Sequence, residues 1–266
     1  MRHLVNLGNS FRARFECLGE SNDLKQVISL YIGSVDCLPD GHPSKPGLLH
    51  NIGTAYFTCF NHSGDLSDLE QAVSGQSDAV DSTPDGHPQK PCHLSDLGTS
   101  FLACFEQSGD LMDLEEAISR QKVAVKLTPK GHPHKAGHLN ELGNSLRARF
   151  DWFGDSSDLE QVISMRSNVI YLASDKHPTK PMYLTNLGNS FRAHFEQFGE
   201  INDIEQAVLR HRNAVHLTPD GHSEKSCCLS CWNPQSRAQP HHHRIDRFPD
   251  MHMLHVHFIP HVCSPS

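Results

Sequence analysis

Glycine recurs in this chain at a fixed step of 45 residues, and no other sequence feature restricts the fold as strongly. A second glycine series lies 11 residues after the first, and Asp, His and Lys series keep the same step. Five series in register over five copies predict a repeat protein whose units share one structure. The series are Gly8, Gly53, Gly98, Gly143 and Gly188; Gly19, Gly64, Gly109, Gly154 and Gly199; Asp23, Asp68, Asp113, Asp158 and Asp203; His42, His87, His132, His177 and His222; and Lys45, Lys90, Lys135, Lys180 and Lys225.

Each unit is predicted to contain two helices. In the first copy, the apolar residues Leu4, Leu7, Phe11, Phe15 and Leu18 have the spacing of one apolar helical face. The second glycine series follows, where the end of a helix favours a residue that tolerates a left-handed backbone. Strands are not expected, because alternation with a period of two is absent over any useful length.

Good N-cap residues indicate where the second helix begins. We expect this start near Asn22, Ser67, Ser157 and Asn202, with Glu70 and Glu160 completing capping boxes in copies two and four. Copy three has Met112 at this place, so its second helix is expected to begin differently.

A Pro-Asp-Gly-His-Pro cluster at residues 84–88 ends the second helix of copy two. We interpret its repeated His and Lys as parts of a turn, because five equivalent His residues do not provide one catalytic site with distinct partners. A polar ladder along one edge, available for binding, is the alternative.

Neither helix of a unit buries its apolar face alone, so the hairpins are expected to stack into an all-α solenoid. The array covers residues 1–225, in units of about 1–45, 46–90, 91–135, 136–180 and 181–225. Residues 226–266 are expected to be an aborted sixth repeat followed by a disordered Cys/His-rich tail. Its Cys228-x-x-Cys231 pair suggests zinc, but no second ligand pair follows at a standard spacing, so no metal site is predicted.

The repeat resembles the tetratricopeptide (TPR) family. Copy two places Leu49, Ile52-Gly53, Tyr56, Ala72, Ala79 and Pro84 at the spacings of that family's pattern, and copies three and five match similarly. The resemblance implies a right-handed α-solenoid of about five TPR-like helical hairpins. Two features differ: the unit has 45 residues rather than about 34, and polar residues replace the large apolar residue in the middle of the second helix. The replacing residues are Gln76, Gln121, Arg166 and His211, whereas Tyr31 fits the pattern.

The first helix lines the groove in TPR arrays, so the resemblance implies that two columns of residues contact a partner. Arg in these columns suits a carboxylate, and the two apolar members would form a pocket midway along the groove. The alternative is a solvated face with hydrogen bonds inside the array. The predicted groove residues are Asn9, Thr54, Thr99, Asn144 and Asn189, followed one turn later by Arg12, Phe57, Leu102, Arg147 and Arg192.

The long unit also resembles TPR-like repeats found beside CHAT domains, a caspase-like protease module, in mushroom-forming fungi. We therefore expect a protein–protein interaction scaffold that binds a peptide or helix. The alternative is the sensor arm of a CHAT-protease-type signalling protein whose effector domain is absent from this chain. A zinc-dependent function through the tail is a weaker third hypothesis.

Composition restricts the partners. The formal charge is −8 and the basic residues do not cluster, so nucleic acid is not expected. The sequence has neither a membrane span nor a secretory stretch, which favours a cytoplasmic location. No catalytic residue and no cofactor are predicted, and self-association through open solenoid ends is a further expectation. The cysteines within the repeats show no disulfide pattern and are expected to be buried free thiols.

Overall fold

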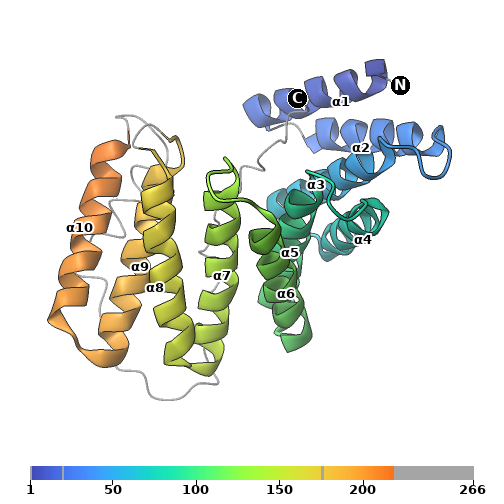
Figure 1. Ribbon diagram of the computed structural model, residues 1–266. Helices are drawn as coiled ribbons and strands as arrows, with labels where there is room; N and C mark the ends of the chain where they lie inside the picture. The colour runs from blue at the N-terminus through green and yellow to red at the C-terminus, as the bar shows by residue number, and fades with distance from the viewer. Residues whose placement is uncertain (1, 20, 175–176, 219–266) are drawn as a thin grey trace. The chain divides into compact units, whose positions relative to one another are not determined.

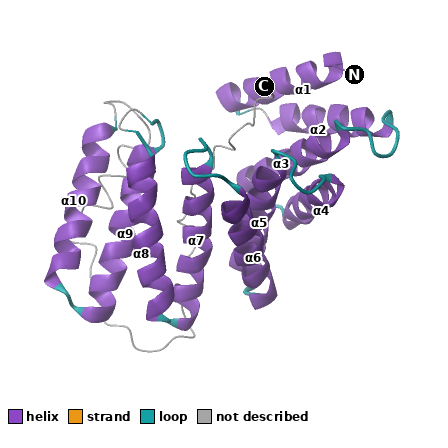
Figure 2. Cartoon of the chain, viewed as in Figure 1, coloured by secondary structure: helices purple, strands orange, loops and turns teal. Residues whose placement is uncertain are grey.

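The computed structural model describes residues 2–19, 21–174 and 177–218 of the 266-residue chain. All regular structure in these residues is α-helical (Figure 2), which confirms the predicted all-α class. The expected tail lies outside them, as does His222. The helices are α1 (Arg2–Leu18), α2 (Ser21–Asp36), α3 (Lys45–Ser63), α4 (Leu66–Ser82), α5 (Lys90–Ser108), α6 (Leu111–Leu127), α7 (Lys135–Phe153), α8 (Ser156–Leu172), α9 (Lys180–Phe198) and α10 (Ile201–Leu217).

Contacts divide the chain into two compact units at His177. The first unit contains the hairpins α1–α2, α3–α4, α5–α6 and α7–α8, and the second contains α9–α10 (Figure 1). Within the first unit, α2 also packs on α3, α4 on α5 and α6 on α7. The first helices of successive hairpins touch as well, α3 with α5 and α5 with α7. The first unit is therefore a stack of hairpins in chain order.

Glycine ends the first helix of each hairpin, as the sequence predicts. Gly64, Gly109, Gly154 and Gly199 have φ values of 72–73°, a left-handed conformation that costs little only for residues without a Cβ atom. In each case the glycine N–H donates to the carbonyl four residues earlier, for example Gly64 to Phe60 at 2.7 Å.

The predicted start of the second helix is wrong by two residues. The N-caps are Asp65, Asp110 and Asp155, whose carboxylates accept hydrogen bonds from the N–H of the residue two positions later at 2.9–3.0 Å. Ser67 and Ser157 provide those N–H groups from inside the helix, so they do not cap it, and Asn22 and Asn202 likewise lie inside α2 and α10. Because Asp110 provides the cap, α6 begins in the same way as its neighbours despite Met112.

The polar residues in the middle of the second helices pack against the glycines of the first helices. A Cβ atom on Gly98 would lie 2.6 Å from Cγ of Gln121, which is fully buried. Gln121 Oε1 also accepts a 2.7 Å hydrogen bond from Ser145 of the next hairpin. A buried amide thus replaces the usual apolar residue and links two hairpins. The equivalent side chains, all at most 5% exposed, are Tyr31, Gln76, Arg166 and His211.

The apolar core runs through the stack. One cluster joins Leu102 and Phe105 of α5 with Leu114 of α6 and Leu146 of α7, and burial of each such side chain contributes roughly 1.5–3 kcal/mol. Leu97 is 2% exposed, whereas the equivalent Leu7 is 45% exposed, because α1 packs mainly against α2.

The described cysteines are all free thiols. Burial is confirmed for Cys92, but the prediction is wrong for Cys17 and Cys37, which are exposed. No helix in the described ranges combines the length and apolar character that crossing a membrane requires.

Candidate functional site

The predicted groove residues divide into buried and accessible positions. Thr54, Thr99 and Leu102 are each at most 8% exposed, and Leu102 belongs to the core cluster between α5, α6 and α7. These three are therefore not available to a ligand in this conformation. The side chain of Asn9 lies outside the described side chains. The partly accessible members are Arg12, Phe57, Asn144 and Arg147 in the first unit, and Asn189 and Arg192 in the second.

The half-buried Phe57 does not form the expected apolar pocket with Leu102. Its ring lies 6.2 Å from that of Phe60, and it packs against the cluster of Phe60, Leu69 and Ala103. Its aromatic surface is thus partly used in joining α3, α4 and α5, and only the remaining edge is available for contact with a partner.

Helix α7 carries a polar cluster that reaches across to α8. Arg166, from α8, donates from Nη2 to Oδ1 of Asn144 at 2.8 Å. Asn144 in turn donates to a carboxylate oxygen of Glu141, as does Asn140, each at 3.4 Å. Asn144 is one of the predicted groove residues, whereas Glu141 and Arg166 are not among them. The available signal for Arg166 was a charged residue in a column otherwise filled by Tyr, Gln and His.

Burial shifts the ionisation of this cluster. It raises the pKa of Glu141 to about 7, against the opposing effects of the two asparagine amides and Arg166. It also lowers the pKa of Arg166 to about 9, and the nearby charge of Arg147 acts in the same direction. The site therefore holds the guanidinium groups of Arg147 and Arg166 beside the carboxyl groups of Glu141 and Asp151. Because Glu141 is partly protonated near neutral pH, a small excess of positive charge is left.

Arg147 extends the cluster toward solvent. Its Nε donates to Oδ1 of Asp151 at 2.9 Å, its guanidinium lies 5.6 Å from the centre of the Phe150 ring, and its side chain is 24% exposed. The pair with Asp151 joins residues one helical turn apart at the surface, where such pairs contribute about 0.3–0.5 kcal/mol. A ligand carboxylate can therefore replace Asp151 at little cost.

A pair of histidines lies between α3 and α5. The rings of His50 and His93 stack with centroids 4.4 Å apart, and Nε2 of His50 lies 3.3 Å from a carboxylate oxygen of Asp96. Burial lowers the pKa of His50 to about 3 and that of His93 to about 4, so both are neutral at physiological pH. The Thr83 hydroxyl donates to the carbonyl of Ala79, so it must accept from Nδ1–H of His93, which fixes that ring's tautomer.

The repeated His and Lys have structural roles in the inter-hairpin turn. The imidazole Nδ1 of His87 accepts a hydrogen bond from the backbone N–H of Gln89. The backbone N–H of His87 donates to the carbonyl of Pro84. The ammonium of Lys90 donates to the carbonyls of Val80 and Thr83, both at 2.7 Å, which satisfies the end of the preceding helix. Lys135 repeats this arrangement in the next turn. In these two turns the lysine side chains therefore have a structural role, as the turn interpretation predicts.

The repeated Asp at the start of each second helix faces a partner on the first helix that changes from hairpin to hairpin. Asp23 pairs with Arg14 and Asp158 with Arg149, each through two hydrogen bonds. His194 takes that place beside Asp203, with its Nδ1 2.6 Å from a carboxylate oxygen. In the second and third hairpins, Cys59 and Cys104 hold the position of Arg14, and burial raises the pKa of both thiols to about 11.

No protein-family model matches this chain, and no curated protein sequence matches it significantly. Similar folds are found among solved structures. A thermophilic TPR protein of Thermus thermophilus is 14% identical with a TM-score of 0.58, over 86% of this chain and 97% of that chain. The TPR-like repeats of a Podosopora anserina putative kinesin light chain are 16% identical with a TM-score of 0.54, over 79% of this chain and 97% of that chain. A substituted form of those repeats has a TM-score of 0.57 at 16% identity, over 81% of this chain and 99% of that chain. At these identities the likeness shows the fold alone: TPR-like helical hairpins.

Proposed function

We propose that this TPR-like chain is a protein-interaction scaffold rather than an enzyme, and that the first helices of its hairpins bind an acidic peptide or helix from a partner protein. The polar cluster on α7 carries the proposal. Arg147 reaches solvent beside the buried Arg166 and beside a carboxyl whose burial favours its neutral form, so Arg147 can hold a further carboxylate. Arg suits this role because its planar fork holds a carboxylate by two hydrogen bonds.

In this proposal the ligand lies along the accessible groove residues. In the first unit, Phe57 offers an aromatic edge on α3, while Asn144 and Arg147 offer polar groups on α7. The first helices between them are in contact, α3 with α5 and α5 with α7, so an extended peptide could cross them in order. Asn189 and Arg192 hold the equivalent places on α9 of the second unit.

The proposal also covers the class of partner, the location and self-association. A net charge of −8 opposes binding to nucleic acid, and the proposed location is the cytoplasm, without membrane attachment. Self-association through the ends of the array remains part of the proposal. A sensor arm of a CHAT-type protein would use the same binding face, so the binding experiment applies to either hypothesis.

The experiment measures fluorescence anisotropy of labelled acidic peptides, each paired with a peptide in which Gln and Asn replace Glu and Asp. We expect binding of acidic members, and Arg147→Ala should weaken it roughly tenfold, since a hydrogen bond to a charged group contributes about 1.5–3 kcal/mol. Lys122→Ala, on the exposed surface of α6, is the control of equal charge change. Equal weakening by both substitutions, or no preference for the acidic peptides, would contradict the proposal.

A further inference from the structure

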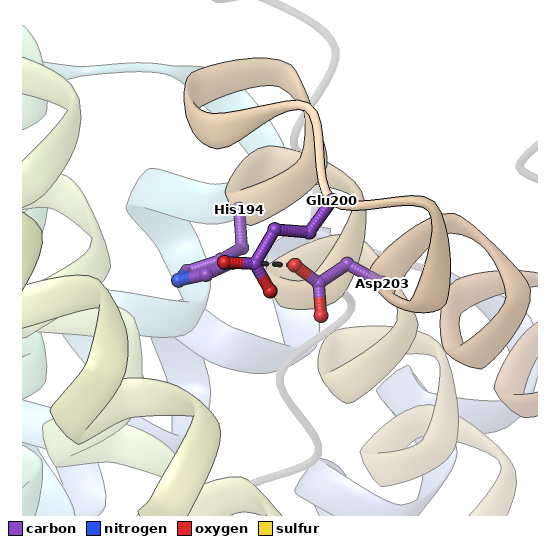
Figure 3. Close-up of side chains that lie close together, drawn as sticks. All are labelled: His194, Glu200 and Asp203. Carbon is purple, nitrogen blue, oxygen red and sulfur yellow. Dashed lines mark hydrogen bonds and ion pairs between the residues drawn. The ribbon is translucent and has the colours of Figure 1, made fainter.

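The α9–α10 hairpin brings three side chains of metal-ligand type together. His194 comes from α9, Glu200 from the turn and Asp203 from the first turn of α10, and Figure 3 shows them converging. One ligand atom from each lies within 4.8 Å of the other two. Among the described residues, no other group of three His, Cys, Asp or Glu side chains is arranged in this way.

Two departures from the repeat create this cluster. The first is His194, which stands where Arg14 and Arg149 pair with the repeated Asp in other hairpins. A guanidinium cannot ligate a metal ion, whereas an imidazole nitrogen is among the commonest ligands. The change preserves the contact with Asp203 and adds the capacity to bind a cation.

The second is Glu200 at the N-cap position of α10, a residue that the first copy of the repeat shares as Glu20 but the three middle copies do not. In α4, α6 and α8 this position is Asp, and its carboxylate is used in capping the helix. Glu200 makes no side-chain cap hydrogen bond. Its carboxylate instead lies over His194 and Asp203 (Figure 3), so the hairpin has two carboxylates beside one imidazole.

The surroundings hold two of the three groups in place. The Asp203 side chain is 8% exposed and that of His194 is 16% exposed. The ring of Phe198 lies against the imidazole with centroids 4.4 Å apart, which fixes one face of His194 and excludes water from it. Two carboxylates packed this closely repel each other in a partly dry site, and a cation between them removes that repulsion.

We propose that His194, Glu200 and Asp203 bind a divalent transition-metal ion, with Zn²⁺ as the best fit. One nitrogen and two carboxylate ligands favour such an ion over Mg²⁺ or Ca²⁺, which prefer oxygen ligands throughout. Zinc ligands lie about 2.0–2.2 Å from the ion, so three of them around one ion are roughly 3.5 Å apart. The ligand atoms lie within 4.8 Å of one another, so a small movement of the exposed Glu200 brings the group to that spacing.

Binding also changes the contact between His194 and Asp203. Their 2.6 Å separation is too short to hold an ion between the same two atoms, so the two groups separate slightly when the ion binds. Three protein ligands leave the remaining coordination positions to water or to a ligand from outside the chain.

Co²⁺ is a suitable probe because it is paramagnetic and takes the same ligands as Zn²⁺. Added to the full-length chain, it should perturb the amide NMR signals of residues near 194, 200 and 203. Cys228 and Cys231 could bind the same ion, but thiolate ligands give Co²⁺ a charge-transfer absorption that imidazole and carboxylates do not. The absorption spectrum therefore distinguishes Co²⁺ bound by the cysteines from Co²⁺ bound by His194, Glu200 and Asp203 in the same sample.

The repeat itself provides the control variants. His194→Arg copies the Arg149–Asp158 pair, so it should keep the hairpin folded and abolish the local Co²⁺ effects. Glu200→Asp copies the capping residue of α8 and should weaken binding at least about tenfold, as loss of a supporting ligand group does. Absence of local perturbation in the wild-type chain, or the same perturbation in His194→Arg, would overturn the proposal.

Discussion

Replacement of Gly98 by Ala should destabilise the first unit, although Ala is ordinarily the better helix residue. The new Cβ atom would lie 2.6 Å from Cγ of Gln121 and 2.9 Å from the backbone carbonyl oxygen of Ala117. Gln121 cannot move away freely, because it is fully buried and holds a hydrogen bond from Ser145. The carbonyl belongs to α6 itself, so relief of the contact requires the two helices to separate.

The expected magnitude follows from two opposing effects. Overpacking of a close contact costs about 1–3 kcal/mol. A Gly-to-Ala change inside a helix contributes about 0.5–1 kcal/mol in the other direction. The net loss in the free energy of unfolding is therefore about 0–2.5 kcal/mol, with a central value of about 1 kcal/mol.

The matched control is Gly33→Ala in α2. Gly33 is exposed, and a Cβ atom there would meet no atom within 4 Å. Only the gain in helix propensity applies, so this variant should be more stable than the wild type by about 0.5–1 kcal/mol. Urea unfolding followed by far-UV circular dichroism compares the two. If Gly98→Ala is as stable as Gly33→Ala, the close packing of glycine against the second helix is refuted.

Three further predictions concern capping and ionisation. Asp110→Ala should destabilise the chain by about 1 kcal/mol in the same urea assay, whereas Met112→Ala should have a much smaller effect, because Asp110 caps α6; equal effects would contradict the cap. Burial raises the pKa of Glu141 to about 7, so the folded state binds more protons than the unfolded state between about pH 4.5 and 7, and stability falls as pH rises through that range. Glu141→Gln should lack this loss, and parallel pH profiles for the two proteins would show the reasoning to be wrong. Burial lowers the pKa of His50 to about 3, so the unfolded state binds more protons below about pH 6.5, and acidification should destabilise the wild type more than His50→Asn; thermal unfolding at a series of pH values measures the difference.

Periodicity was sufficient to predict the hairpins because it reflects backbone requirements that all copies share. Glycine at the end of each first helix has the left-handed conformation expected of it. The segment that holds the repeated His and Lys forms a hydrogen-bonded turn between hairpins, as predicted. The N-cap was missed because Ser67 and Asp65 are both good caps by type. Only the backbone conformation, extended at Asp65, decides which of them begins α4.

The candidate site was less predictable, because burial depends on neighbouring hairpins rather than on the column a residue occupies. Leu102 and Arg147 hold the same place in the repeat, yet Leu102 is in the core and Arg147 reaches solvent. Glu141 was missed because its ionisation depends on Asn140, Asn144 and Arg166, which come together only after α7 and α8 pack. The metal cluster depends on the direction of the Glu200 side chain, which residue type alone does not determine.

The most direct test of the central claim, that the first helices carry the binding face, is site-specific photo-crosslinking to a labelled acidic peptide identified by anisotropy. One crosslinker replaces Asp151, exposed on α7 beside Arg147, and the other replaces Gln161, exposed on α8. We expect the peptide to be captured from position 151 and not from position 161. Capture from position 161 alone, or equally from both, would contradict the central claim.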